Sequence, residues 1–269
     1  MDMEHFFIGE WPVFYLDNHL LALYKPAGLL VQSDDTGDIS LLEMAKDWIK
    51  WKFGKPGRVF LGMVHRLDRP VAGVVCFART SKAAARLSEQ FRSGRTRKEY
   101  LAVVEGRPRQ PSAQLIHYLD RGDKRSTHVD FLPGPGRQEA RLRYSVLDSS
   151  GARSLLEIEL ETGRRHQIRA QLASIGHPIV GDIRYGATAP LDQAQIALLA
   201  RRLTVEHPTR KEPLVFEAPL PRGWPWPVQA SAALGPPWNW REIEPRLGSA
   251  RRGDEEIGRL GEERKRKTP

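Results

Sequence analysis

Asp68 is the carboxylate in this sequence best placed to act as a nucleophile. It stands in "MVHRLDRPVAGVVCFA", among the basic side chains His65, Arg66 and Arg69. Neighbouring cations favour the ionised carboxylate, which is the nucleophilic form. The apolar run that follows indicates that Asp68 lies at the edge of a buried strand. The alternative is a solvated ion pair or a turn residue, the usual state of an aspartate beside arginine.

A second cluster of basic side chains lies in "LETGRRHQIRAQL". Thr162 can cap a helix whose first turns carry Arg165, His166 and Arg169, and positions 165 and 169 share one face. A basic surface helix is the common alternative. The apolar positions of the same helix must face inward, so we expect the guanidinium of Arg169 to be partly buried. A buried guanidinium requires an anion, and Asp68 is the natural candidate.

Tyr100 follows a basic turn and begins an apolar strand in "RTRKEYLAVVEG". By default it is a core aromatic residue with its hydroxyl reaching solvent. The alternative is a ring on which an extruded nucleobase stacks, because proteins that act on a single base take it out of the helix. The side chains that could hold the neighbouring phosphates are Arg92, Arg95, Arg97 and Lys98.

The elements that must position these residues form an α+β pattern. Short strands are expected around the "DN" within residues 13–31, and further strands over 140–148 and 154–161. Ser40 and Glu43 form a capping-box pattern that opens a helix over 40–53. Additional helices are expected over 81–91 and 166–176. Strict strand-helix alternation is missing, so we expect a mixed, mainly antiparallel sheet flanked by helices and loops.

The charge of the chain favours a polyanionic partner. Its 269 residues hold 42 Lys and Arg against 33 Asp and Glu, a net charge of +9. Nucleic acid is the first candidate, and an anionic membrane surface the second. A folded domain is expected over residues 1–240, and residues 245–269 predict a basic, disordered tail. The last 24 residues contain eight basic and five acidic side chains, so most of the excess lies outside the tail.

Several classes of protein are excluded by what the sequence lacks. Cys76 is the only cysteine and lies in an apolar run, which excludes an internal disulfide or a cysteine-based zinc site and indicates a small buried hydrophobe. The histidines show no metal-ligand spacing, so no metal is expected. The N-terminus carries acids where a signal peptide carries bases, and no run of about 18 apolar residues occurs. We expect a cytoplasmic protein that is not bound to a membrane.

Taken together, the segments resemble the RluA-type RNA pseudouridine synthase family. "HRLD" resembles its catalytic-aspartate motif, "KEYLAVVEG" its tyrosine motif, and "TGRRHQIR" with "GHPIVGDIRYG" its arginine motif and the segment that follows. "YKPAGLLV" resembles its first motif. The similarity runs in order over roughly residues 12–220. It implies the catalytic fold of that family and isomerisation of uridine to pseudouridine in transfer or ribosomal RNA, without a metal or organic cofactor, by a chain expected to be a monomer.

The resemblance also implies a role for each of the residues above. Asp68 would be the nucleophile, attacking either the sugar carbon or the pyrimidine ring. Arg169 would pair with Asp68, Tyr100 would stack on the flipped base and assist proton removal, and Arg66 would help fill the gap that the base leaves. The side chains expected to contact RNA are Arg66, Arg69, Arg92, Arg95, Arg97, Lys98, Arg165 and His166.

Val71 and Ala72 depart from the family, which usually has threonine and serine there, and Tyr24 stands where the family favours asparagine. The lost hydroxyls leave open a second reading, a catalytically degenerate relative that binds RNA as a chaperone or assembly factor. A third reading is a glycosidase with paired carboxylates, which ranks last because Asp68 has no obvious acidic partner.

Overall fold

The computed structural model describes residues 6–8, 11–35, 37–120, 126–192, 195–221 and 223–226. The expected tail over 245–269 and the end of the expected domain at residue 240 lie outside these residues. The strands are β1 (Phe6–Ile8), β2 (Trp11–Leu16), β3 (Leu20–Lys25), β4 (Gly62–Met63), β5 (Ala72–Ala78), β6 (Arg97–Glu105), β7 (Ser112–Asp120), β8 (His128–Asp130), β9 (Gln138–Ser150), β10 (Arg153–Leu160), β11 (Leu198–Glu206) and β12 (Pro213–Glu217). The helices are α1 (Leu41–Lys52), α2 (Ser81–Arg92) and α3 (Gln167–Ser174), with a 3-10 turn at Ile183–Tyr185.

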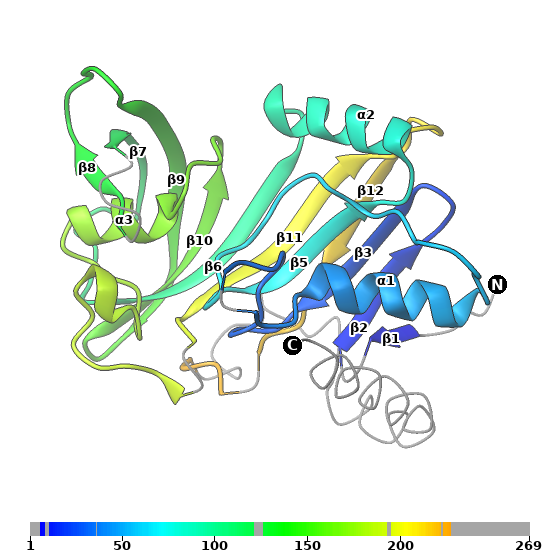
Figure 1. Ribbon diagram of the computed structural model, residues 1–269. Helices are drawn as coiled ribbons and strands as arrows, with labels where there is room; N and C mark the ends of the chain where they lie inside the picture. Colours follow the sequence, from blue (N-terminus) through cyan, green and yellow to red (C-terminus); the bar gives the residue numbers. More distant parts are fainter. Residues whose placement is uncertain are drawn as a thin grey trace.

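The strands form one sheet that is antiparallel except at a single pair. Its order is β1-β2-β3-β5-β11-β6-β10-β9-β7-β8, with β4 beside β5 and β12 beside β11. The parallel pair is β5 with β11. In Figure 1 the sheet has two parts that meet at β6, with α1 in front of β2 and β3 and α3 in front of the β7 to β9 strands. The predicted α+β class with a mainly antiparallel sheet is confirmed.

Helix α1 begins where its sequence predicts. The Ser40 side chain accepts a hydrogen bond from the Glu43 amide, and the Glu43 carboxylate accepts one from the Ser40 amide, which completes the capping box. Leu41, Ala45 and Ile49 are buried on the inward face. No helix among the described residues is both long and apolar enough to cross a bilayer.

The centre of the core lies where β5 meets β11. All seven residues of β5 are buried, including Cys76, as its apolar sequence predicts. Gly73 has a φ of +133°, and a Cβ at this position would lie 2.3 Å from the carbonyl oxygen of Ala200. Only glycine allows this approach, so Gly73 brings the start of β5 against the start of β11. The segment that carries Asp68 enters the sheet at this point.

Candidate active site

Asp68 lies in a turn whose backbone carbonyls accept hydrogen bonds from the buried side chain of Lys25. The Val71 amide donates to the Asp68 carbonyl at 3.1 Å and closes the turn. Lys25, the last residue of β3, has no exposed surface and donates from Nζ to the carbonyls of Arg69 at 3.1 Å and Val71 at 2.7 Å. It donates also to Pro26 at 2.9 Å. All three Lys25 protons therefore go to the backbone.

Two amides from other segments complete this support. Gly28 donates to the Arg69 carbonyl at 2.8 Å, and Ile196 donates to the Pro70 carbonyl at 3.2 Å. Every carbonyl from Asp68 to Val71 thus accepts a hydrogen bond. A turn held in this way presents the Asp68 side chain on a fixed backbone.

The buried amine of Lys25 predicts a specific pH dependence of stability. Burial lowers its pKa from 10.5 to about 7, an effect that the charge of Asp68 opposes and that of Arg69 supports. Between these two pKa values the unfolded chain binds more protons than the folded chain, so stability rises with pH there. Relative to Lys25→Met, the wild-type free energy of unfolding should rise by about 2 kcal/mol from about pH 7 to about pH 9. Urea titrations of both proteins at the two pH values measure this difference, and equal changes would contradict it.

Arg169 joins Asp68 to a second, more deeply buried carboxylate. Its Nη1 donates to Asp68 Oδ2 at 3.1 Å, which confirms the predicted pair. Its Nε and Nη2 donate to the two oxygens of Asp182 at 2.7 and 2.8 Å. The side chains of Arg169 and Asp182 are only 5% and 2% exposed, whereas that of Asp68 is 20% exposed. Burial is the largest single influence and would lower the pKa of Arg169, but the hydrogen bonds and charges of Asp182 and Asp68 together outweigh it and raise the pKa. The guanidinium is therefore a permanent cation beside Asp68.

The start of α3 differs from the sequence-based prediction. Thr162 does not cap the helix, since its hydroxyl donates to Gln167 Oε1 at 2.7 Å and its Oγ1 accepts from the Arg141 amide at 2.9 Å. The residue at the N-cap is His166, in the left-handed conformation with a φ of 52°. The buried Gln167 amide holds the preceding loop by accepting from the Arg164 amide at 3.0 Å. The turn before the helix is thus built by Gln167.

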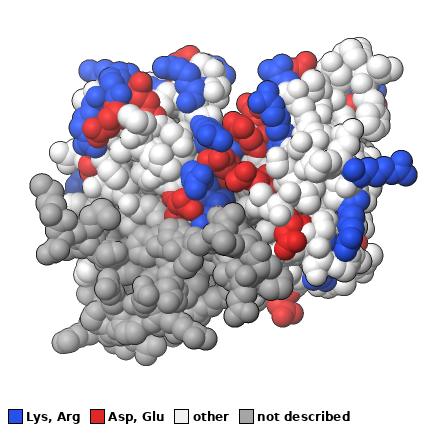
Figure 2. Space-filling view, turned by 180° about the vertical axis from the view of Figure 1, so that it is seen from behind, with Lys and Arg blue, Asp and Glu red and all other residues white. Residues whose placement is uncertain are grey.

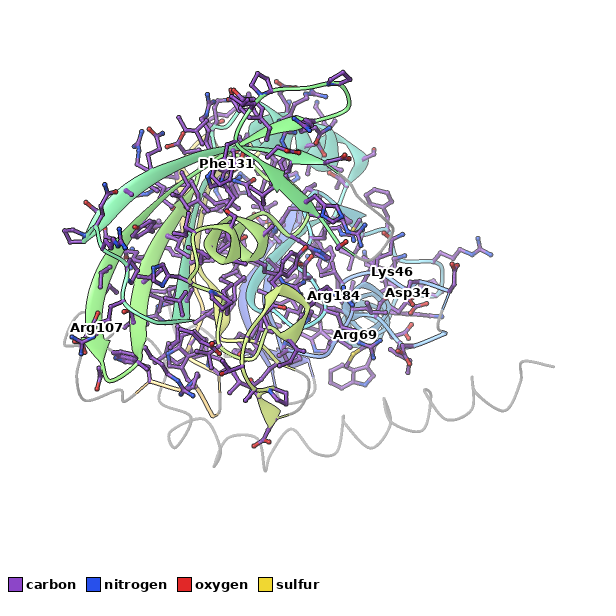
Figure 3. All side chains as sticks on the ribbon, turned by 90° about the vertical axis from the view of Figure 1, so that its left-hand side faces the viewer. Asp34, Lys46, Arg69, Arg107, Phe131 and Arg184 are labelled. Atoms are coloured by element: carbon purple, nitrogen blue, oxygen red, sulfur yellow. The ribbon has the colours of Figure 1, made fainter. Side chains whose placement is uncertain are left out.

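Asp68 and Arg169 line a cavity of about 600 Å³. Within the described residues its lining holds five arginines and three aspartates, an excess of positive charge. Figure 3 shows three of them, Asp34, Arg69 and Arg184, gathered on the side that faces forward in Figure 1, with Arg107 on the other side. The opposite face, seen in Figure 2, interleaves Lys and Arg with Asp and Glu. The cavity combines a carboxylate with a basic wall, which suits an anionic substrate.

Four of the eight residues predicted to contact RNA line this cavity, namely Arg66, Arg69, Arg165 and His166. Arg66 is exposed and makes no ion pair within the described residues. Arg69 pairs with Asp38 at 2.9 Å and donates to the Gly28 carbonyl, so it also ties the neighbouring loop to the Asp68 turn.

The other four, Arg92, Arg95, Arg97 and Lys98, do not line the cavity. Arg92 pairs with Glu89. Lys98 lies on the same face of β6 as Tyr100, because side chains two apart on a strand share a face. Its Nζ donates to the Thr162 carbonyl at 3.4 Å.

Arg97 projects from the opposite face of β6. Alternation along the strand puts it with Glu99 and away from Tyr100, and Arg97 Nη2 lies 3.1 Å from Glu99 Oε1. Its Nε lies 3.5 Å from Glu159 Oε1 on the adjacent strand β10. Arg97 therefore lies on the face of the sheet opposite to that of Tyr100.

Tyr100 is not one of the residues that line the cavity. It packs partly buried against the core, next to Ala200 of β11 and Ile158 of β10. Burial raises the pKa of its hydroxyl well above the ordinary value, and the charge of Asp68 adds to the shift. The Tyr100 hydroxyl therefore stays protonated, and it is close enough to Asp68 for the carboxylate charge to affect its pKa.

Asp182, Lys25 and Tyr185 contribute to the site without having been singled out from the sequence. Asp182 and Tyr185 lie in the segment "GHPIVGDIRYG", where an acid among apolar and glycine residues is the signal that could have revealed a buried ion pair. The Arg169 guanidinium lies over the Tyr185 ring, with 5.0 Å between its Cζ atom and the ring centroid. Among the described residues no group of three or more His, Cys, Asp or Glu side chains could hold a metal ion.

Comparison with known proteins gives the family of the chain. Residues 19–174 match the family model described as RNA pseudouridylate synthase. The chain is 35% identical over 216 residues to the uncharacterized RNA pseudouridine synthase YhcT of Bacillus subtilis, covering 79% of this chain and 70% of that protein. It is 31% identical over 253 residues to tRNA pseudouridine synthase C of Salmonella typhimurium, covering 87% of this chain and 92% of that protein.

A solved structure shows the same fold. The structure titled Human RNA Pseudouridylate Synthase Domain Containing 4 superimposes with a TM-score of 0.66 at 25% identity, over 79% of this chain and 89% of that one. The fold, the order of the motifs and the matched model agree. The chain therefore belongs to the RNA pseudouridine synthase family, whose members are isomerases, and within it to the RluA-like members.

Proposed function

We propose that this chain converts uridine to pseudouridine in transfer or ribosomal RNA, with Asp68 as the nucleophile. The observation that carries the proposal is the Asp68 carboxylate, held on an immobilised turn 3.1 Å from the buried Arg169 guanidinium at the wall of a basic cavity. Similarity to tRNA pseudouridine synthase C supports transfer RNA as the substrate. Ribosomal RNA is the alternative, since the chain is also 33% identical to ribosomal large subunit pseudouridine synthase D of Nitrosomonas europaea, over 78% of this chain and 62% of that protein.

The reaction needs one nucleophile, and the substrate and the product contain the same atoms. The carboxylate of Asp68 attacks either C1′ of the ribose or C6 of the pyrimidine, and the bond between N1 and C1′ breaks. The base turns, C5 bonds to C1′, and the bond to Asp68 breaks. The proton on C5 then leaves and N1 gains a proton, so the product is an isomer of the substrate. Arg169 stabilises the ionised carboxylate at the start and at the end of this cycle.

The target nucleotide must leave the RNA helix to reach Asp68, because the reacting atoms lie within the base stack. Arg66 is exposed at the cavity and carries no ion pair within the described residues, so it is available to occupy the gap. The resemblance assigns stacking of the base to Tyr100, and because Tyr100 does not line the cavity, this role requires the base to reach past the cavity wall. The protonated Tyr100 hydroxyl can donate a hydrogen bond but, with its raised pKa, cannot act as the initial base.

The second candidate, a degenerate RNA-binding relative, was suggested by Val71 and Ala72. Both side chains are buried, at 3% and 2% exposure, and pack in the core. The turn is held by Lys25 and by backbone amides, so its conformation does not depend on hydroxyls at these two positions. This arrangement favours the catalytic function.

Mapping of pseudouridine tests the proposal. Pseudouridine positions in total RNA are compared among a strain lacking the gene, the same strain expressing the wild type, and the strain expressing Asp68→Asn. We expect at least one site in transfer or ribosomal RNA that is lost with the gene, restored by the wild type and not restored by the variant. Identical maps in all three strains would refute the proposal.

RNA binding should weaken steeply with salt. Contacts to about four phosphates would raise the Kd roughly 50-fold between about 0.05 and about 0.2 M salt, because each contact releases counterions. Arg66→Gln should reduce the slope of log K against log salt by about 1. Arg97→Gln is the matched control, since Arg97 faces Glu99 and Glu159 across the sheet, and its slope should equal that of the wild type. A wild-type slope near zero would contradict phosphate recognition.

A further inference from the structure

His166 occupies a conformation that its sequence does not favour. It is the N-cap of α3, its φ is 52°, and its side chain makes no capping hydrogen bond. Among the described residues only His166 and Lys211 combine a positive φ with a side chain. Such a conformation persists where surrounding contacts impose it, and it is often found at functional sites. The contacts of the His166 ring should therefore explain its backbone.

The ring of His166 is enclosed, with 7% of its side chain exposed, and both nitrogens face polar groups. Nδ1 lies 2.9 Å from the Tyr185 hydroxyl, and the two rings meet edge to face. The Tyr185 oxygen also accepts a hydrogen bond from the Thr127 amide at 3.0 Å. With one lone pair occupied in this way, the hydroxyl can donate its own proton to Nδ1.

The protonation of the ring then follows. Burial lowers the pKa of His166 to about 4, and the charge of Asp68 opposes this shift while Arg169, Arg165 and Arg184 support it. The neutral ring carries one proton. With Nδ1 accepting from Tyr185, that proton is on Nε2, which lies 3.7 Å from Asp68 Oδ2.

The two carboxylate oxygens of Asp68 have different contacts. Arg169 Nη1 and His166 Nε2 both approach Oδ2. Oδ1 receives no hydrogen bond from the described residues. Because Asp68 lines the cavity and its Oδ2 is occupied, Oδ1 is the oxygen whose lone pairs remain available for attack.

We propose that His166, with its tautomer set by Tyr185, is a positioning residue that donates from Nε2 to Asp68 Oδ2 and thereby directs Oδ1 at the target nucleotide. The proposal rests on the proposed function and adds a residue and an attacking atom to it. The 3.7 Å separation shortens to a hydrogen bond when RNA fills the cavity, as is common for catalytic contacts.

Two replacements of His166 separate this role from RNA binding. Asparagine tolerates the left-handed conformation but is too short to reach Asp68, whereas glutamine can place an amide N–H near the position of Nε2. Under single turnover with saturating RNA that carries the mapped site, His166→Asn should lower the rate constant about 100-fold, the loss expected for a misplaced nucleophile. His166→Gln should recover at least about tenfold of that loss, and the Kd for RNA should stay within about twofold in both.

A double-mutant cycle tests the part played by Tyr185. Tyr185→Phe keeps the ring under Arg169 and removes the hydroxyl, and it should lower the rate constant about tenfold in the wild type but not further in His166→Asn. Tyr144→Phe, whose hydroxyl donates to the Gln110 carbonyl away from the cavity, is the matched control and should leave the rate unchanged.

Each outcome decides the question. Additive effects of His166→Asn and Tyr185→Phe, or a raised Kd with an unchanged rate at saturation, would overturn the proposal, and the second result would make His166 a phosphate contact. Thermal unfolding of each variant identifies loss of folding. If His166→Asn melts at a lower temperature than the wild type, the proposal still requires His166→Gln to have a higher rate constant than His166→Asn. If the wild type converts no uridine, the proposed function fails, and not this inference alone.

Discussion

Asp68→Asn is expected to lower the conversion of uridine by at least about 10⁴-fold and to leave RNA binding within about twofold of the wild type. Loss of a nucleophile typically has an effect of this size, because the amide cannot form the covalent intermediate. The surrounding basic wall is unchanged, so phosphate contacts persist. Release of tritium from uridine labelled at C5 measures conversion, and a filter assay measures binding.

The structure indicates that this variant folds. Asp68 is 20% exposed, and its loss leaves Arg169 with both hydrogen bonds to Asp182, so the buried guanidinium keeps a partner. Asp148→Asn is a suitable control because Asp148 does not line the cavity, and its activity should equal that of the wild type. An Asp68→Asn protein that retains full activity would remove Asp68 from the mechanism.

Local sequence signals predicted most of the elements. The pair Ser40 and Glu43 predicted the start of α1, because a capping box is completed within four residues. The alternation in 140–148 and 154–161 predicted β9 and β10. The helix over 166–176 was also predicted, but the predicted N-cap, Thr162, was wrong. The Thr162 hydroxyl hydrogen-bonds instead to the Arg141 amide and to Gln167, and no local sequence pattern predicts these partners.

The candidate site was predicted in part. The pairing of Arg169 with Asp68 was correct, but the stronger partner, Asp182, was not recognised, since bidentate geometry arises only when α3 and the 3-10 turn at Ile183–Tyr185 fold against each other. Lys25 was named only as part of a motif, because its role depends on the carbonyls of a turn more than 40 residues away.

The position of Tyr100 shows a further limit of sequence reasoning. Tyr100 was expected to stack on the base that Asp68 attacks, but Asp68 and Arg169 line the cavity and Tyr100 does not. Strand alternation in β6 could have separated Arg97 from Tyr100, since the two lie an odd number of residues apart. The stacking role of Tyr100 and the RNA contacts stay predictions.

The buried pair of Arg169 and Asp182 should be the most sensitive ion pair at the site. Asp182→Asn removes the main counter-charge of a guanidinium that is 5% exposed, so the free energy of unfolding should fall by about 3–5 kcal/mol. The remaining bond to Asp68 should then draw that carboxylate toward Arg169 and lower activity about 100-fold. Asp38→Asn is the matched control: its partner Arg69 is half exposed, and the change should be below about 1 kcal/mol.

A second variant distinguishes the contribution of this pair to stability from its contribution to catalysis. Replacement of a buried ion pair by apolar groups is often neutral, whereas removal of one partner is not. Arg169→Met combined with Asp182→Leu should therefore recover most of the stability lost in Asp182→Asn, yet remain inactive because Asp68 has lost its guanidinium. Urea unfolding and tritium release measure the two effects. Recovery of both stability and activity would show that the pair serves packing alone, whereas stability without activity assigns the cation at Asp68 to catalysis.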